Sequence, residues 1–98
     1  MKFAALIQYS QDKDLVAKVR PLHRAYLTSL LHEGKLAVAG PLTDDSGALI
    51  VYEADTPEAA EEILKSDPFH VEGIFLSWKL YPWKVVFSNH SLLPVQPT

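Results

Sequence analysis

The sequence contains no cysteine, no dense cluster of lysine and arginine, and no long apolar run. Without cysteine there can be no disulfide, no thiolate nucleophile and no cysteine-based zinc site. The formal net charge of −3 argues against a nucleic-acid partner. No stretch approaches the length of a membrane span. The apolar run near the first residue is too short for a signal peptide, so we expect a cytoplasmic protein.

Metal and cofactor motifs are missing as well. The histidines lack the spacing of metal ligands, and there is no glycine-rich phosphate loop, no Gly-x-Ser-x-Gly and no haem signature. We therefore expect neither a metal nor another cofactor. The chain has 98 residues, of which 48% are hydrophobic and 21% charged, as in one ordinary globular domain. We expect a single domain over residues 1–98, with a C-terminal arm at 88–98 that lacks regular structure.

Apolar periodicity and turn residues predict four strands and two helices. The strands are expected at 2–9, 36–40, 48–54 and 73 to about 87, the last bent or interrupted at Pro82. Residues 14–19 could form one helical turn or more. Proline in a helix interior removes a hydrogen bond, so we place the main helix at about 20–33, after a looser turn, with Pro21 in its first turn and Gly34 as its C-cap. The second helix begins after the cap residue Thr56 and ends near Ser66.

The order strand-helix-strand-strand-helix-strand is the split βαβ arrangement, an α+β fold with two helices on one face of a four-stranded antiparallel sheet. These strands are apolar on both faces, although a sheet with one wet face should alternate. In the last strand one face takes Ile74, Leu76, Trp78 and Leu80, and the other takes Phe75, Tyr81, Val85 and Phe87. An uncovered apolar face predicts a homodimer or larger homo-oligomer, with leucine, alanine, isoleucine and tryptophan at the interface. The alternative is a monomer with an apolar sheet face.

One end of this sheet collects the residues that could form a site: Tyr9, Arg20, His23, Gly40, Pro41, Asp67 and His70. His23 borders the buried stripe of the first helix, and imidazole exchanges protons near neutral pH. An aspartate against one ring nitrogen would fix its tautomer. Asp67 is a candidate because the dipole at a helix C-terminus disfavours a carboxylate. The alternatives are a capping role for Asp67 and a hydrogen bond from His23 to a backbone carbonyl.

Other side chains at this end are candidates for ligand binding. Arg20 and Arg24 lie one helical turn apart and could hold a carboxylate or phosphate, or be solvated charges. His70 could take the place of Asp67 beside the histidine, or lie in a surface loop. The residues expected to bind the ligand are therefore Tyr9, Arg20, Arg24, Gly40, Pro41 and His70. The remaining histidines, His32 and His90, are assigned no role.

Six segments in chain order resemble the YciI-like (YCII-related) family: Gln8–Lys13, Arg20–His23, Gly34–Leu36, Ala39–Pro41, Ser66–Phe69 and Tyr81–Phe87. The resemblance covers nearly the whole chain except the C-terminal arm. It implies a ferredoxin-like fold of the dimeric α/β-barrel superfamily. It also implies an active site around a His–Asp pair, which falls here on His23 and Asp67.

Three functions fit these residues. The first is a cofactor-independent isomerase or lyase in which His23, oriented by Asp67, is the general acid/base toward a small, cyclic or aromatic, organic acid. The second is a non-catalytic ligand-binding or accessory domain, in which Arg20 or Arg24 holds an anion. The third is a structural module of a larger assembly that binds no ligand.

Overall fold

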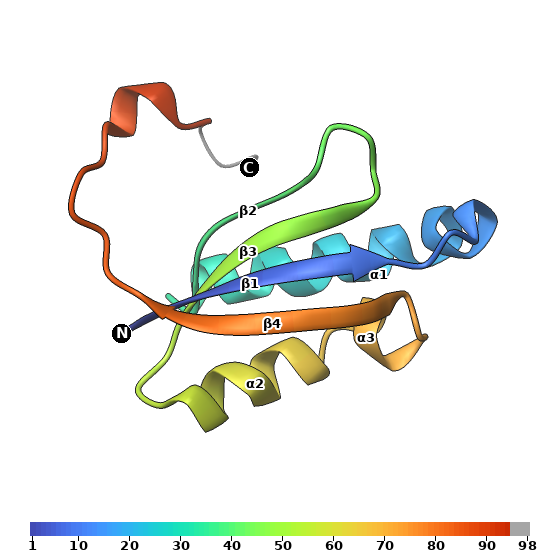
Figure 1. Cartoon of the computed structure of the whole chain (residues 1–98), viewed down its shortest axis with the longest axis horizontal. Coiled ribbons are helices and arrows are strands. Elements are labelled where there is room, and N and C mark those ends of the chain that lie inside the picture. The colour runs from blue at the N-terminus through green and yellow to red at the C-terminus, as the bar shows by residue number, and fades with distance from the viewer. Residues whose placement is uncertain (95–98) are drawn as a thin grey trace.

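The structure is a computed structural model that describes residues 1–94, and it has the predicted ferredoxin-like α+β fold (Figure 1). The elements follow in the order β1 (Lys2–Tyr9), α1 (Lys13–His32), β2 (Leu36–Pro41), β3 (Gly47–Glu53), α2 (Pro57–Lys65), α3 (Pro68–Val71), β4 (Phe75–Trp83) and the short 3-10 helix η1 (His90–Leu92). The sheet is antiparallel throughout, with strand order β2-β3-β1-β4. The helices α1 and α2 cover one of its faces.

The core lies between that inner face and the helices. Alternate residues of β1 point into it, because side chains alternate between the faces of a strand. Phe3, Ala5, Ile7 and Tyr9 are accordingly buried. Their partners on β3 share this face, since residues directly opposite in the register lie on the same side.

The helix α1 begins at Lys13, so the predicted start near residue 20 is wrong. Val16 and Val19 are buried and attach the first turns to the core. The Asp12 side chain caps the helix by accepting a hydrogen bond from the backbone N–H of Leu15 at 3.1 Å. Pro21 lies on the exposed side, where water can satisfy the one carbonyl that loses its partner. Burial of the first turns therefore outweighs one missing backbone hydrogen bond.

The strand β4 differs from its prediction in its end and in its faces. It ends at Trp83, not near Phe87, although Pro82 lies within it; β4 is an edge strand, where proline is tolerated. The register to β1 shifts after Gln8, so that Gln8 pairs with Ser77 but Tyr9 pairs with Phe75. This bulge moves Phe75 to the inner face, where it joins Trp78 in the core, and corrects the predicted division of the strand.

The outer face of the sheet carries five exposed large apolar side chains, which we call the outer-face patch. Their exposed fractions are 52% for Leu6, 39% for Val38, 41% for Leu49, 45% for Tyr81 and 48% for Trp83. The sheet is thus apolar on both faces, as predicted. Leucine and tryptophan occur in the patch as predicted, through Leu6, Leu49 and Trp83, but isoleucine does not, because Ile50 belongs to the inner face.

The segment after β4 leaves the body of the protein and then turns back (Figure 1). Its apolar side chains are exposed, and Phe87 is 94% exposed. The predicted arm at 88–98 contains the helix η1, so it is not wholly irregular, and residues 95–98 lie outside the described part of the chain. Within residues 1–94, no helix combines the length and the apolar character needed to cross a membrane.

Candidate functional site

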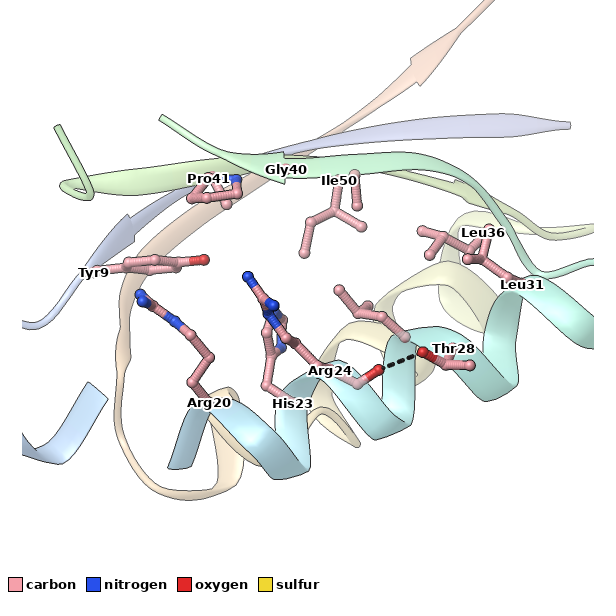
Figure 2. Close-up of a pocket in the computed structure, with 13 residues that line it drawn as sticks. Tyr9, Arg20, His23, Arg24, Thr28, Leu31, Leu36, Gly40, Pro41 and Ile50 are labelled. Atoms are coloured by element: carbon pink, nitrogen blue, oxygen red, sulfur yellow. Dashed lines mark hydrogen bonds between the residues drawn. The ribbon is translucent and has the colours of Figure 1, made fainter. Parts of the chain in front are cut away.

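A cavity of about 350 Å³ opens between α1 and the inner face of the sheet (Figure 2). Helix α1 contributes Arg20, His23, Arg24, Leu27, Thr28 and Leu31, and the strands contribute Tyr9, Leu36, Ala39, Gly40, Pro41, Ala48 and Ile50. The walls are mainly apolar, and the polar groups gather at the end formed by Tyr9 and the two arginines. This combination is typical of a site for a small organic ligand.

His23 is a buried residue of α1 with only 6% of its surface exposed. Its ring stacks on the ring of Phe69 with centroids 3.9 Å apart and planes 3° from parallel. Its Nδ1 atom lies 2.7 Å from Oδ1 and 2.8 Å from Oδ2 of Asp67. A carboxylate can only accept, so Nδ1 donates and Nε2 is the nitrogen left to accept a proton. Stacking and the hydrogen bond together fix both the plane and the tautomer of the ring.

Asp67 is completely buried and is held by two kinds of donor. It caps the short helix α3, accepting a hydrogen bond from the backbone N–H of Phe69 at 2.9 Å. The same carboxylate accepts from His23 across 44 positions of sequence. A buried carboxylate without partners would be costly, and these two contacts supply its partners. The capping role and the contact with His23 are therefore both present.

The two arginines differ in their surroundings. Nη2 of Arg20 lies 2.8 Å and 2.9 Å from the two carboxylate oxygens of Asp45, in the connection between β2 and β3. Arg24, one turn further along α1, has no ion pair with any carboxylate of the described residues. Figure 2 shows both side chains reaching from α1 toward the strands, with Arg20 close to Tyr9.

Tyr9 ends β1 on the inner face, and its phenol lies beside the cavity. Burial raises the pKa of Tyr9 to about 12; the nearby Arg20 partly opposes this shift, and Asp45 adds to it. The phenol is consequently neutral near pH 7 and is a hydrogen-bond donor for an oxygen atom of a ligand.

The predicted site residues separate into three groups. The cavity brings together Tyr9, Arg20, His23, Arg24, Gly40 and Pro41. Asp67 lies behind His23 and reaches the cavity through it. His70 is not part of the lining and does not contact His23 in place of Asp67; its ring centroid lies 6.4 Å from that of Phe75 and 6.5 Å from that of Trp78.

Sequence reasoning missed Asp45 as a neighbour of the site. It occurs in the run Asp44-Asp45-Ser46-Gly47, whose residue types are typical of a turn. The sequence did contain a signal, because this turn has two acidic residues and uses only one of them. Asp44 is the residue that accepts hydrogen bonds from Ser46. Among residues 1–94, no three histidine or acidic side chains gather in a way that would hold a metal ion.

Comparison with known protein families gives a match over most of the chain. Residues 1–84 match the YCII-related domain. The chain belongs to the YCII-related family. It is 36% identical to protein YciI of Escherichia coli, in an alignment that covers 81% of this chain and 95% of that protein. It is also 37% identical to the uncharacterized protein YjpA of Bacillus subtilis, over 59% of this chain and 73% of that protein.

One similar solved structure has an enzyme's name. The 5-chloro-2-hydroxyhydroquinone dehydrochlorinase from Burkholderia phenoliruptrix, in complex with 2,5-dihydroxybenzoquinone, is 26% identical with a TM-score of 0.75. The similarity covers 86% of this YCII-related chain and 94% of the dehydrochlorinase. It supports the fold and makes a catalytic role plausible for this chain.

Proposed function

We propose that this protein is a cofactor-independent enzyme of the lyase or isomerase type, acting on a small cyclic or aromatic organic acid. In this proposal His23 is the general acid/base and Asp67 positions it. The observation that carries the proposal is the 2.7 Å contact between Nδ1 of His23 and Asp67, in a buried wall of a ligand-sized cavity. The reaction then needs three kinds of side chain, because ligand binding, proton transfer and orientation of the His23 ring each depend on a different group.

The proposed chemistry is transfer of one proton through Nε2 of His23. Nδ1 donates to Asp67, so Nε2 has a free electron pair that can take a proton from a ligand carbon or hydroxyl group. Asp67 stabilises the imidazolium that forms. In an elimination the electron pair of the broken bond to hydrogen is used to form a double bond. The leaving group departs with the electron pair of the bond that joined it to the ligand. In an isomerisation the imidazolium returns the proton to another atom of the ligand.

The remaining lining residues fit a planar anionic ligand. Leu27, Leu31 and Ile50 provide apolar surface for a ring. Arg24 provides a cation without an ion pair among the described residues, and the neutral Tyr9 phenol provides a donor. The dehydrochlorinase, named for a chlorinated cyclic substrate and solved with a cyclic dihydroxyquinone, supports this class of ligand by similarity.

The direct test is turnover of cyclic organic acids and hydroxyhydroquinones, beginning with 5-chloro-2-hydroxyhydroquinone. Loss of HCl from this compound is followed as chloride release. The wild type should release chloride or convert another compound of the panel, and His23→Ala should lose that turnover. The matched control is His32→Ala, which removes an exposed histidine from the same helix. Equal turnover in His23→Ala and wild type would contradict the proposal.

A second candidate function is ligand binding without catalysis. It is favoured by the cavity lining, which contains two arginines and no aspartate or glutamate. In that case 2,5-dihydroxybenzoquinone would bind without being converted. The affinity for this compound would be unchanged in His23→Ala and lower in Arg24→Gln. An enzyme should instead show the larger loss of turnover in His23→Ala.

We also propose that the outer-face patch packs against the same face of a second copy. Five exposed apolar side chains on one sheet face form a larger patch than isolated surface residues do. A two-fold arrangement would bury both patches at once and leave the cavity, on the opposite face, accessible. A cytoplasmic location stays a prediction from the sequence.

A further inference from the structure

The cavity has two arginines, and only one of them lacks an ion-pair partner in the described part of the chain. Arg20 donates through Nη2 to both carboxylate oxygens of Asp45, at 2.8 Å and 2.9 Å. Arg24 makes no such contact within residues 1–94. Asp45 itself is not a lining residue of the cavity, so its carboxylate acts on the site through Arg20.

We propose that Asp45 determines the charge of the ligand that the cavity accepts, an inference that rests on the proposed anion-binding role of the arginines. Asp45 neutralises Arg20 and leaves Arg24, among residues 1–94, as the one cation of the lining without an ion pair. The cavity therefore prefers a ligand with a single anionic group. A ligand with two anionic groups has to displace Asp45 from Arg20, or place its second charge opposite the Arg20–Asp45 pair, which has no net charge.

Asp45 is an effective competitor because it is part of the chain. Its effective concentration at Arg20 does not fall with dilution, whereas that of a free ligand does. The side chains of Arg20 and Asp45 are 33% and 37% exposed, so solvent weakens their attraction. Asp45 therefore competes with a ligand's second anionic group mainly through its fixed position in the chain and not through a strong attraction.

The connection between β2 and β3 holds Asp45 in place independently of the arginine. Asp44 accepts hydrogen bonds from the backbone N–H and the hydroxyl of Ser46, at 3.0 Å and 2.6 Å. Asp45 has a φ of +61°, in the left-handed region. Asparagine adopts this region more readily than most residues, so Asp45→Asn removes the charge with little strain on the backbone.

The test compares ligands that differ in the number of carboxylates. Benzoate and the three benzenedicarboxylates (phthalate, isophthalate and terephthalate) are titrated calorimetrically into the full-length protein at one pH. Wild type should bind benzoate at least as tightly as any dicarboxylate. Asp45→Asn should raise the affinity for at least one dicarboxylate about tenfold relative to benzoate, as expected for a gained charge contact.

Two further variants identify the cause. Asp44→Asn removes the same charge one residue away, and its amide oxygen can still accept from Ser46; the preference should stay as in wild type. In the double variant Asp45→Asn/Arg20→Gln the gain for the dicarboxylate should disappear. The inference is overturned if Asp45→Asn leaves the preference unchanged, if Asp44→Asn changes it equally, or if the gain persists without Arg20.

These outcomes are separate from those of the proposed reaction. Binding is measured without turnover, so a wild type that binds benzoate but shows the wrong charge preference refutes only the role of Asp45. If neither benzoate nor a dicarboxylate binds wild type or Asp45→Asn, the arginines are not anion ligands and the inference falls. Chloride release and its dependence on His23 still decide the proposed reaction.

Discussion

Nδ1 of His23 lies 2.7 Å from Oδ1 of Asp67, although the two residues are 44 positions apart in the chain. The same carboxylate accepts from the backbone N–H of Phe69, whose ring stacks on His23. Asp67 therefore connects the start of α3 to the imidazole by two routes, directly and through Phe69. A change at Asp67 should consequently affect both local stability and the orientation of His23, and the two effects can be separated.

Asp67→Asn should reduce turnover far more than stability. The asparagine oxygen can still cap α3, so the loss of unfolding free energy should be about 1 kcal/mol or less from the cap. The charge that stabilises the imidazolium is lost, and the amide can donate to Nδ1 and select the wrong tautomer. We expect turnover to fall about 10²- to 10⁴-fold. Denaturant titration and the chloride-release assay measure the two quantities.

Asp67→Ala is the matched comparison for that prediction. It removes the cap as well as the charge and should be less stable than Asp67→Asn by about 1 kcal/mol. Turnover by Asp67→Asn that equals wild type would show that Asp67 serves only to cap α3.

Two glycines near the site should respond in opposite ways to alanine. A Cβ atom at Gly47 would overlap the backbone carbonyl of Ile7 on the neighbouring strand, whereas a Cβ atom at Gly40 would meet nothing within 4 Å. Gly47→Ala must displace one strand from the other and should cost about 2 kcal/mol or more. Gly40→Ala should fold with nearly wild-type stability. Thermal unfolding of both variants is the measurement, and a stable Gly47→Ala would contradict the register of β1 and β3.

Local patterns were sufficient to predict much of this fold. A short apolar run ended by polar residues located β1, and the capping signal at Thr56 located α2. The features that failed depend on contacts between distant segments. Pro21 suggested a late start for α1, because the sequence does not show that Val16 and Val19 pack against the core. The bulge opposite Gln8 could not be predicted, because it depends on the register between two strands far apart in sequence.

For the candidate site as well, local patterns predicted some features, and contacts between distant segments determined the others. Topology placed His23 and Asp67 at one end of the sheet, but only the three-dimensional structure shows their hydrogen bond. Asp45 was overlooked because its partner Arg20 lies 25 positions away. His70 was included because it follows Asp67 closely, yet its ring faces Phe75 and Trp78. Side-chain direction at the end of a helix is set by packing that sequence proximity does not show.

Tyr9 should make the stability of the protein fall in alkaline solution. Burial raises the pKa of the folded-state phenol to about 12, from 10.0 for a free tyrosine. Between about pH 10 and 12 the unfolded chain loses this proton while the folded chain keeps it, so ionisation favours unfolding. The stabilising effect of Tyr9 is thus complete below pH 10 and is lost as the pH rises to about 12.

Tyr9→Phe is the test of this dependence. Denaturant titrations between pH 9 and 12 should show a shallower loss of unfolding free energy in Tyr9→Phe than in wild type. A loss will remain in the variant, because burial also raises the pKa of Tyr52. Parallel curves for the two proteins would show that the phenol of Tyr9 is accessible to solvent and ionises normally.

Lysine substitutions in the outer-face patch should convert the proposed dimer to a monomer. Leu6 and Leu49 are direct partners in the register of β1 and β3, and both side chains are about half exposed in the single chain. In a face-to-face dimer, Leu6→Lys/Leu49→Lys would bury four like charges against apolar surface, at a cost of several kcal/mol. Sedimentation equilibrium should give twice the chain mass for wild type and the chain mass for this variant. Leu22→Lys is the matched control, because Leu22 is 62% exposed on α1, away from the patch, and should leave the dimer intact. A wild type that stays monomeric at the highest concentration measured would refute the proposed interface.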